Sequence, residues 1–203
     1  MEDEQVYKLL LLGEQAVGKS SLLNRYVDDV FEVNIMGTAG LDLKKKTLNI
    51  NGDSVKVLIY DSAGHERFRS IAKNQFSKAD GIVIVYDITD KKTFEAVNMW
   101  FNLSNKEMTK ENECLFIGNK IDLEEQRQVS FNEGNELAKK YNVAFIETSA
   151  KESLNVNEAF VKIVSNIYKK DKGKEKGMKE KGKKGRNGKD KEKENGCCSY
   201  SST

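Results

Sequence analysis

The chain has 203 residues and a formal net charge of +2, which suits one α/β domain with an appendage. The charge is uneven: residues 169–196 hold 13 Lys or Arg against 6 Asp or Glu, whereas residues 1–168 hold 21 against 26. The acidic balance of the larger part argues against nucleic acid as its partner. The three cysteines form neither a disulfide framework nor the spacing of a zinc site.

Short apolar runs alternate with helical patterns over residues 6–168, which is typical of βα units that stack into a mostly parallel sheet. The Asn51-Gly52-Asp53 stretch is a strong hairpin signal and predicts one antiparallel strand pair. The sequence therefore predicts an α/β fold with a six-stranded, mostly parallel sheet, one antiparallel strand and helices on both faces. The expected strands are residues 6–12, 41–50, 55–60, 81–86, 114–118 and 143–147.

Two helices have clear signals in the second half of the chain. Ser130 and Glu133 have capping-box spacing and predict a helix that ends near Tyr141. Apolar residues with helical spacing predict a last helix over 156–169. Beyond Lys170 the chain has almost nothing to bury and is expected to be disordered. We therefore divide the chain into a folded domain at 1–168, a Lys-rich tail at 169–196 and a dicysteine segment at 197–203.

A glycine-containing motif follows the first predicted strand and precedes a helical pattern, a context that favours a phosphate-binding loop over an ordinary turn. Its backbone N–H groups and the following helix N-terminus can face a phosphate. Lys19 is expected to bridge the β- and γ-phosphates, and the Ser20 hydroxyl to ligate Mg²⁺. The predicted contact residues are Gly13, Glu14, Gln15, Ala16, Val17, Gly18, Lys19, Ser20 and Ser21.

A second motif, Asp61-Ser62-Ala63-Gly64, ends the strand at 55–60 and places a carboxylate at the edge of the sheet beside this loop. Asp61 is expected to hold Mg²⁺ through water, and the Gly64 N–H to approach a γ-phosphate. Asp-x-x-Gly alone is common in turns, but its position after the phosphate loop favours the binding interpretation.

A third motif, Asn119-Lys120-Ile121-Asp122, supplies a carboxylate that suits the N1–H and the exocyclic amine of guanine, an arrangement that adenine lacks. Asn119 is expected to brace the loops, and the Lys120 stem to cover the base. After the last strand, Ser149-Ala150-Lys151 can offer a backbone N–H to guanine O6. Without the two preceding motifs, an exposed polar loop would be the ordinary interpretation of Asn-Lys-x-Asp.

These motifs resemble those of Ras-superfamily small GTPases, and the chain is most similar to the Rab family over about residues 5–170. The resemblance rests on Thr38-Ala39-Gly40-Leu41-Asp42-Leu43-Lys44, similar to switch I, and on residues 63–71, similar to switch II. Residues 81–89 and 147–151 add to it. It implies a P-loop NTPase G domain that binds GTP or GDP with Mg²⁺, hydrolyses GTP and switches effectors in vesicle trafficking.

The same resemblance implies roles for residues in and around the switches. Thr38 would ligate Mg²⁺ through its hydroxyl and meet the γ-phosphate through its backbone. Phe31 lies where the family places an aromatic ring against guanine, with a plain core Phe as the alternative. Leu43, Tyr60 and Phe76 fall at three apolar effector-contact positions, where the family more often has Phe, Trp and Tyr.

Position 65 is His, where nearly all catalytically active relatives carry the Gln that orients the attacking water. A neutral imidazole does not present a carbonyl acceptor and an amide donor as Gln does, so we expect slow intrinsic hydrolysis by a catalytic set of His65, Gln15, Lys19 and Thr38. Alternatively, His65 faces solvent and an activating protein restores hydrolysis. Gln15 lies nearest the γ-phosphate and can hinder an activating arginine or itself position water.

The tail also departs from the family. Cys197 and Cys198 are similar to the pairs that Rabs present for double geranylgeranylation, yet five residues follow them and no C-a-a-X box exists. Two lipid chains and the Lys-rich segment would anchor the chain to anionic membrane. The alternative is two unmodified thiols.

The resemblance implies a monomer that cycles between the cytoplasmic face of an intracellular membrane and a cytosolic pool. The implied partners are an exchange factor, a GTPase-activating protein, a GDP dissociation inhibitor, a Rab escort protein and effectors. Sparse cysteine and the lack of a basic leader or a run of ~20 apolar residues agree with a cytosolic chain. Two alternatives are a GTP-locked binding module that hardly hydrolyses and a P-loop kinase, which the absence of an Arg-rich lid disfavours.

Overall fold

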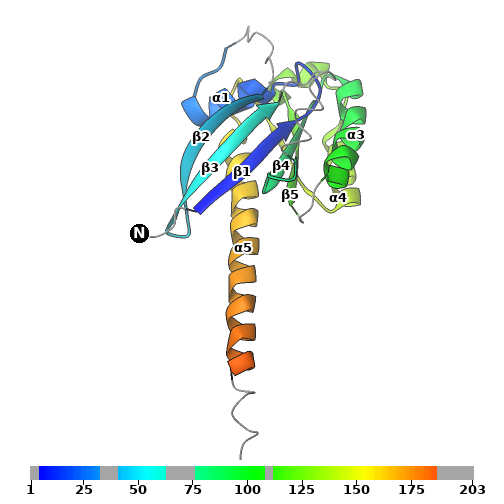
Figure 1. Ribbon diagram of the computed structural model, residues 1–203. Helices are drawn as coiled ribbons and strands as arrows, with labels where there is room; N and C mark the ends of the chain where they lie inside the picture. Colours follow the sequence, from blue (N-terminus) through cyan, green and yellow to red (C-terminus); the bar gives the residue numbers. More distant parts are fainter. Residues whose placement is uncertain (1–4, 33–40, 63–75, 108–111, 187–203) are drawn as a thin grey trace, which may run out of the picture. The chain divides into compact units, whose positions relative to one another are not determined.

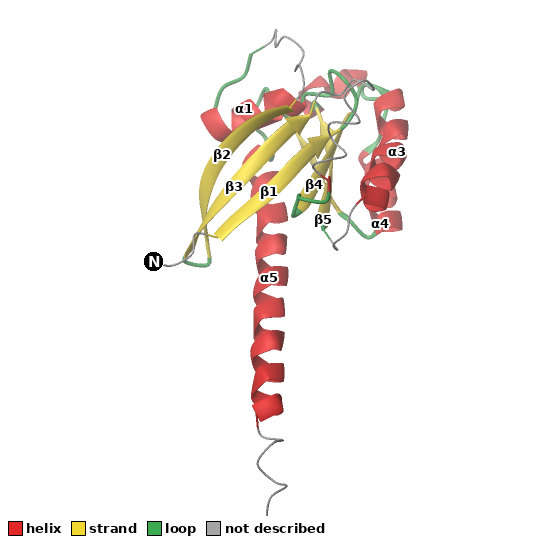
Figure 2. Ribbon diagram, in the orientation of Figure 1, coloured by secondary structure: helices red, strands yellow, loops and turns green. Residues whose placement is uncertain are grey.

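The structure, a computed structural model, describes residues 5–32, 41–62, 76–107 and 112–186. Within these ranges six strands form one sheet in the order β2-β3-β1-β4-β5-β6 (Figures 1 and 2). Neighbouring strands are parallel except for the antiparallel pair of β2 and β3. This confirms the predicted fold class. The strands are β1 (Gln5–Leu12), β2 (Leu41–Ile50), β3 (Asp53–Ser62), β4 (Gly81–Asp87), β5 (Glu113–Asn119) and β6 (Ala144–Thr148).

Helices cover both faces of the sheet, as the continuous apolar runs of β1 and β4 require. On one face, Leu10 and Ile84 pack in a cluster with Trp100 of one helix and Ala138 of another. On the other face, Ile163 and Ile167 of the last helix lie against Gly81. The helices are α1 (Lys19–Asp28), α3 (Lys91–Glu107), α4 (Phe131–Tyr141), α5 (Val156–Arg186) and the 3₁₀ helix η2 (Ile121–Gln126).

The predicted local signals have the expected geometry. Ile50 pairs with Asp53 across a two-residue loop, and Asn51 and Gly52 have φ values of 54° and 94°, as in a type I′ turn. At the start of α4 the Ser130 hydroxyl accepts from the Glu133 N–H at 3.3 Å, and the Glu133 carboxylate accepts from the Ser130 N–H at 2.9 Å. Both the hairpin and the capping box are therefore confirmed.

The prediction for the end of the last helix is wrong. Helical spacing of apolar residues predicts an end near Lys169 with disorder beyond it, whereas α5 continues to Arg186. Lys and Glu are good helix formers, and a helix satisfies its own backbone hydrogen bonds, so a lack of core residues does not prevent it. Residues 187–203 lie outside the described residues.

The chain divides into two compact units, residues 1–167 and 168–203. None of the helices in the described part of the chain combines the length and the hydropathy that a membrane span requires.

Candidate nucleotide-binding site

The predicted motifs meet at one edge of the sheet. The phosphate loop follows β1, Asp61 lies near the end of β3, and the Asn119 and Ser149 motifs follow β5 and β6. Since β1, β3, β5 and β6 run parallel in one sheet, their carboxyl ends share an edge. The fold thus gathers segments from Gly13 to Lys151 into one candidate site.

Two glycines give the phosphate loop its path. Gly13 has a φ of 139°, and a Cβ there would lie 2.2 Å from the Val85 carbonyl oxygen of β4. Gly18 has a φ of 94°, and a Cβ there would lie 2.4 Å from the Asn119 Nδ2. Any larger residue at either position meets backbone or a buried amide, so the loop requires glycine at both ends. Gly18 is the N-cap of α1 and offers no side-chain cap, which leaves the helix N–H groups available to an anion.

Lys19 is buried beneath this loop, with 6% of its surface exposed. Its Nζ donates to the carbonyl oxygens of Gly13 at 3.0 Å and Glu14 at 2.7 Å. Burial lowers the pKa of Lys19 to about 8, and attraction to Asp61 and Glu14 offsets only part of that shift. A phosphate placed here would favour the charged ammonium.

Ser20 and Asp61 bring oxygen donors together from two elements. The Ser20 hydroxyl at the start of α1 donates to Oδ2 of Asp61, which is 2% exposed. The neighbouring Ser62 hydroxyl donates to the Leu11 carbonyl at 2.6 Å and fixes the end of β3 against β1. Hydroxyl and carboxylate oxygens are ligands that suit Mg²⁺, so these residues fit the metal that the sequence implies.

A single buried amide joins the phosphate loop to the other loops. Asn119, 1% exposed, donates through Nδ2 to the Val17 carbonyl at 2.9 Å. Its Oδ1 accepts from the Thr148 hydroxyl at 3.1 Å, at the end of β6. Asn119 therefore ties three strand ends together.

The base-recognition residues are also positioned by side-chain contacts. Lys120 has a left-handed backbone, and its Nζ lies 2.6 Å from Oδ2 of Asp87 at the end of β4. The Ser149 hydroxyl donates to Oδ1 of Asp122 at 2.6 Å, which links the two loops that flank the predicted base position. Ala150 is buried beside Ser149. This arrangement can present a carboxylate and a backbone N–H to one planar base.

Three contacts near the site were not expected from the sequence. Asp87 fixes Lys120, as described above. The indole N–H of Trp100 on α3 donates to Oε1 of Glu14 at 3.0 Å, which ties that helix to the phosphate loop. Arg25 of α1 bonds the carbonyls of Ala150 and Lys151. A charged residue directly after the apolar run at 81–86 was a signal for Asp87. No local pattern reveals the partners of Trp100 or Arg25.

Some predicted site residues lie outside the described residues: Thr38, Gly64, His65, Cys197 and Cys198. Gln15 is exposed on the phosphate loop, next to Ala16, whose φ is 63°. Ser21 is half-buried in the first turn of α1. Phe31, after α1, is half-buried.

Comparison with known proteins identifies the family. The Ras family model matches residues 8–169. Ras-related protein SEC4 of Saccharomyces cerevisiae is 43% identical over 82% of this chain and 77% of its own length. GTP-binding protein ypt2 of Schizosaccharomyces pombe is also 43% identical, over 82% of this chain and 83% of its own. Ras-related protein Rab-8 of Diplobatis ommata is 41% identical over 82% of this chain and 80% of its own length. The chain belongs to the Rab family of small GTPases.

This Rab-family chain therefore binds GTP and GDP with Mg²⁺ and hydrolyses GTP, in membrane-associated vesicle trafficking controlled by regulators and read by effectors. The assignment also removes the P-loop kinase alternative.

The three residues predicted to contact effectors are placed differently from one another. Leu43 of β2 is 50% exposed and pairs with half-buried Tyr60 of β3. Phe76 is fully buried, in a cluster with Leu10 and Trp100. The expectation that Phe76 forms part of a contact surface is therefore wrong for this structure, because its ring fills the core beneath the sheet.

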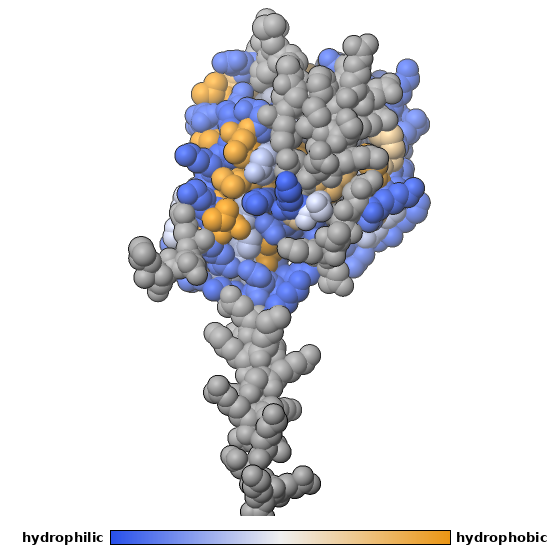
Figure 3. All heavy atoms as spheres, in the orientation of Figure 1, coloured by the Kyte–Doolittle hydropathy of each residue, from blue (hydrophilic) through white to orange (hydrophobic). Residues whose placement is uncertain are grey.

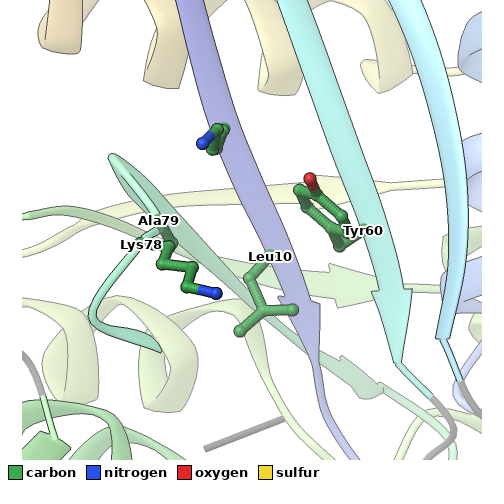
Figure 4. A pocket seen from close by; sticks show the side chains of 5 residues that line it. Leu10, Tyr60, Lys78 and Ala79 are labelled. Atoms are coloured by element: carbon green, nitrogen blue, oxygen red, sulfur yellow. The ribbon is translucent and has the colours of Figure 1, made fainter. Parts of the chain in front are cut away.

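The sheet face around Tyr60 has a mixed character. Figure 3 shows apolar side chains among charged ones over β2 and β3. A shallow hollow here is lined by Lys8, Leu10, Tyr60, Lys78 and Ala79 (Figure 4). Its lining contains no residue of the phosphate or base loops, so the hollow is separate from the candidate nucleotide site.

The depressed pKa of Lys19 predicts that nucleotide binding takes up a proton. With a pKa of about 8, roughly half of Lys19 is neutral at pH 8 in the nucleotide-free Rab-family chain, and a bound polyphosphate favours the charged form. Titration calorimetry of GDP in two buffers of different ionisation enthalpy should report uptake of roughly half a proton at pH 8.

Raising the pH towards 9 should increase this uptake, and lowering it towards 7 should decrease it, because Lys19 is then already charged. The same lysine predicts that the nucleotide-free chain gains stability between pH 8 and 10.5, since the unfolded state retains its proton there. Binding without any uptake at pH 8 and pH 9 would contradict this account.

Proposed function

We propose that this Rab-family GTPase hydrolyses GTP slowly on its own and therefore holds the GTP state for a long time. The observation that carries the proposal is the sequence at two positions that flank the γ-phosphate: His65 replaces the water-orienting Gln of active relatives, and Gln15 replaces a small residue of the phosphate loop. His65 lies outside the described residues, so support comes from side-chain chemistry and from the geometry of the phosphate loop.

The phosphate side of the site has the parts that this reaction needs. Lys19 would meet the β- and γ-phosphates, because its buried ammonium is held under the loop by the Gly13 and Glu14 carbonyls. Ser20 and Thr38 would ligate Mg²⁺ directly, and Asp61 would hold it through water. Bound there, Mg²⁺ would supply positive charge that offsets the negative charge developing on the phosphates. Gly64 would sense the γ-phosphate through its N–H.

The base side would select guanine. Asp122, oriented by the Ser149 hydroxyl, would accept from N1–H and the exocyclic amine. The Ala150 N–H would donate to O6, and the stem of Lys120 would cover the base with Phe31 nearby. Adenine lacks the N1–H and the O6 that these groups recognise.

Of the residues in the proposed catalytic set, His65 is the one expected to slow hydrolysis. Gln offers a carbonyl acceptor and an amide donor from one side chain, which can accept from the attacking water and donate to the phosphate. Neutral imidazole places its one acceptor and its one donor on opposite sides of a rigid ring. The water is then less well oriented for in-line attack, and the intrinsic rate falls.

A second candidate is a GTP-locked module that binds effectors and hardly hydrolyses. Gln15 favours it, because its exposed side chain on the phosphate loop can obstruct the arginine that an activating protein inserts. Under the first proposal an activating protein restores hydrolysis, and under the second it does not.

The His65→Gln variant should hydrolyse GTP at least about tenfold faster than the wild-type chain, and at most by the roughly 10²- to 10⁴-fold that one positioned group contributes. The measurement is single-turnover hydrolysis by protein loaded with GTP and Mg²⁺. GDP affinity serves as the control and should not change, because His65 is expected to act only beside the γ-phosphate.

The Gln15→Ala substitution, made in the wild-type chain and in the His65→Gln variant, tests whether Gln15 positions water or obstructs an activating arginine. If Gln15 positions water, its removal slows the wild-type chain; if it obstructs, its removal increases the effect of an activating protein only. Equal rates of GTP hydrolysis by the wild-type chain and the His65→Gln variant would show that His65 does not slow intrinsic hydrolysis.

We further propose that Cys197 and Cys198 carry geranylgeranyl groups that anchor the chain to the cytoplasmic face of an intracellular membrane. One lipid chain gives only reversible binding, whereas two anchor firmly, and the Lys-rich tail adds attraction to anionic headgroups. The five residues after the pair are compatible with an escort protein that recognises the folded domain. A GDP dissociation inhibitor would then return the chain to the cytosol.

Mass spectrometry of the chain purified from its native cell should show two isoprenoid additions, one each at Cys197 and Cys198. Cys197→Ser with Cys198→Ser should move a tagged chain from the membrane fraction to the soluble fraction, while Cys114→Ser is the matched control, since that thiol lies inside β5. Free thiols at both tail cysteines would refute the anchor.

A further inference from the structure

The guanidinium of Arg25 lies between α1 and the loop that follows β6. Its Nε donates to the Ala150 carbonyl at 2.9 Å, and one terminal nitrogen donates to the Lys151 carbonyl at 3.2 Å. Arg25 is on the same helix as Lys19 and Ser20, which begin it. One side chain therefore connects the helix of the phosphate site to the loop of the base site.

The remaining terminal nitrogen of Arg25 holds the other end of α1. It donates to the carbonyl and to Oδ1 of Asp29, both at 2.9 Å. Asp29 is the C-cap of α1, with a φ of 56°, and leads directly to Val30 and Phe31. The ion pair itself is weak, because the Asp29 side chain is 84% exposed. The backbone carbonyls are the partners that matter, and only a planar fork reaches all of them.

Arg25 supports the loop after β6 at the two residues that follow Ser149. Its ends are closed by two hydrogen bonds between Ser149 and Leu154, each 3.0 Å. Residues 151–154 are exposed, and Ser153 has a φ of 58°. Ala150 and Lys151 lie between these closures and receive their side-chain support from Arg25. Fixing the Ala150 carbonyl limits rotation of the residue whose N–H is assigned to guanine O6.

We propose that Arg25 is a positioning residue that sets how long guanine nucleotide stays bound, by coupling α1 and the segment after Asp29 to the guanine loop. It acts through the Ala150 and Lys151 carbonyls and not by chemistry of its own. The inference rests on the proposed contact of the Ala150 N–H with O6 and goes beyond it by naming what holds that contact in place. A partner that pulls on the segment after Asp29 would loosen the guanine loop through the same side chain.

The test is the rate at which the full-length chain releases bound GDP into excess competing nucleotide. Arg25→Met, which keeps the length of the side chain and loses the donors, should release GDP roughly ten- to a hundredfold faster. Arg25→Lys should release GDP at an intermediate rate, because an ammonium lacks the planar set of donors that a guanidinium offers to several carbonyls. Lys139→Met is the matched control: it removes an exposed cation paired with Glu136 and should leave release unchanged.

A nucleotide analogue distinguishes positioning from a general loss of structure. In 6-thio-GDP, sulfur, a weak acceptor, replaces O6 while the N1–H and the amine remain. Release of this analogue from the wild-type chain should already be fast, so the additional effect of Arg25→Met should shrink towards none. Arg25→Lys repeats the comparison if the Met variant is poorly folded by circular dichroism.

Equal GDP release by wild type and both Arg25 variants would overturn the inference while leaving the proposed function intact. Equal acceleration for GDP and 6-thio-GDP would also overturn it, because Arg25 would then act without the O6 contact. If the wild-type chain does not distinguish the two nucleotides, the proposed role of Ala150 fails, and the inference fails with it.

Discussion

The side chain of Asn119 is the contact on which the site depends. One buried amide donates to the Val17 carbonyl of the phosphate loop and accepts from Thr148 at the end of β6. A Cβ on Gly18 would collide with the Asn119 amide. The phosphate loop therefore accommodates this amide only because residue 18 is glycine. Phosphate recognition and base recognition therefore do not form independently, because the same group positions both. Arg25, further along α1, adds a second connection, from that helix to the carbonyls of Ala150 and Lys151.

The second constraint is electrostatic. The fold buries Lys19 where its charge is poorly solvated and satisfies it with two carbonyls, while the helix N-terminus above it has no side-chain cap. Burial of an ammonium costs free energy that a polyphosphate recovers on binding. The buried ammonium and the uncapped helix N-terminus thus favour an anion before any switch segment takes part. Under the proposed function, the rate of hydrolysis depends in addition on how His65 orients the attacking water.

The sequence predicted most of the fold because its signals are local: continuous apolar runs for buried strands, Asn51-Gly52 for the hairpin, and the Ser130 capping box. The site followed, since parallel strands bring their following loops to one edge. Long-range partners were not predictable. Nothing near Arg25 or Trp100 in the chain indicates Ala150 or Glu14, and an aromatic at position 76 has the same pattern whether it is exposed or buried. The prediction of disorder beyond Lys170 was wrong as far as Arg186. A lack of apolar residues indicates that a segment has little to bury, but it does not prevent Lys and Glu from forming a helix.

The most direct test of the account is amide hydrogen exchange in the GDP-bound chain, comparing wild type with Asn119→Ala. The variant leaves the Val17 carbonyl and the Thr148 hydroxyl without their partner. If one amide ties the loops together, exchange should become faster in peptides that cover both residues 13–20 and residues 148–154, while the β2–β3 hairpin should be unchanged. Faster exchange confined to one of the two loops would contradict the claim that Asn119 joins phosphate and base recognition into one unit.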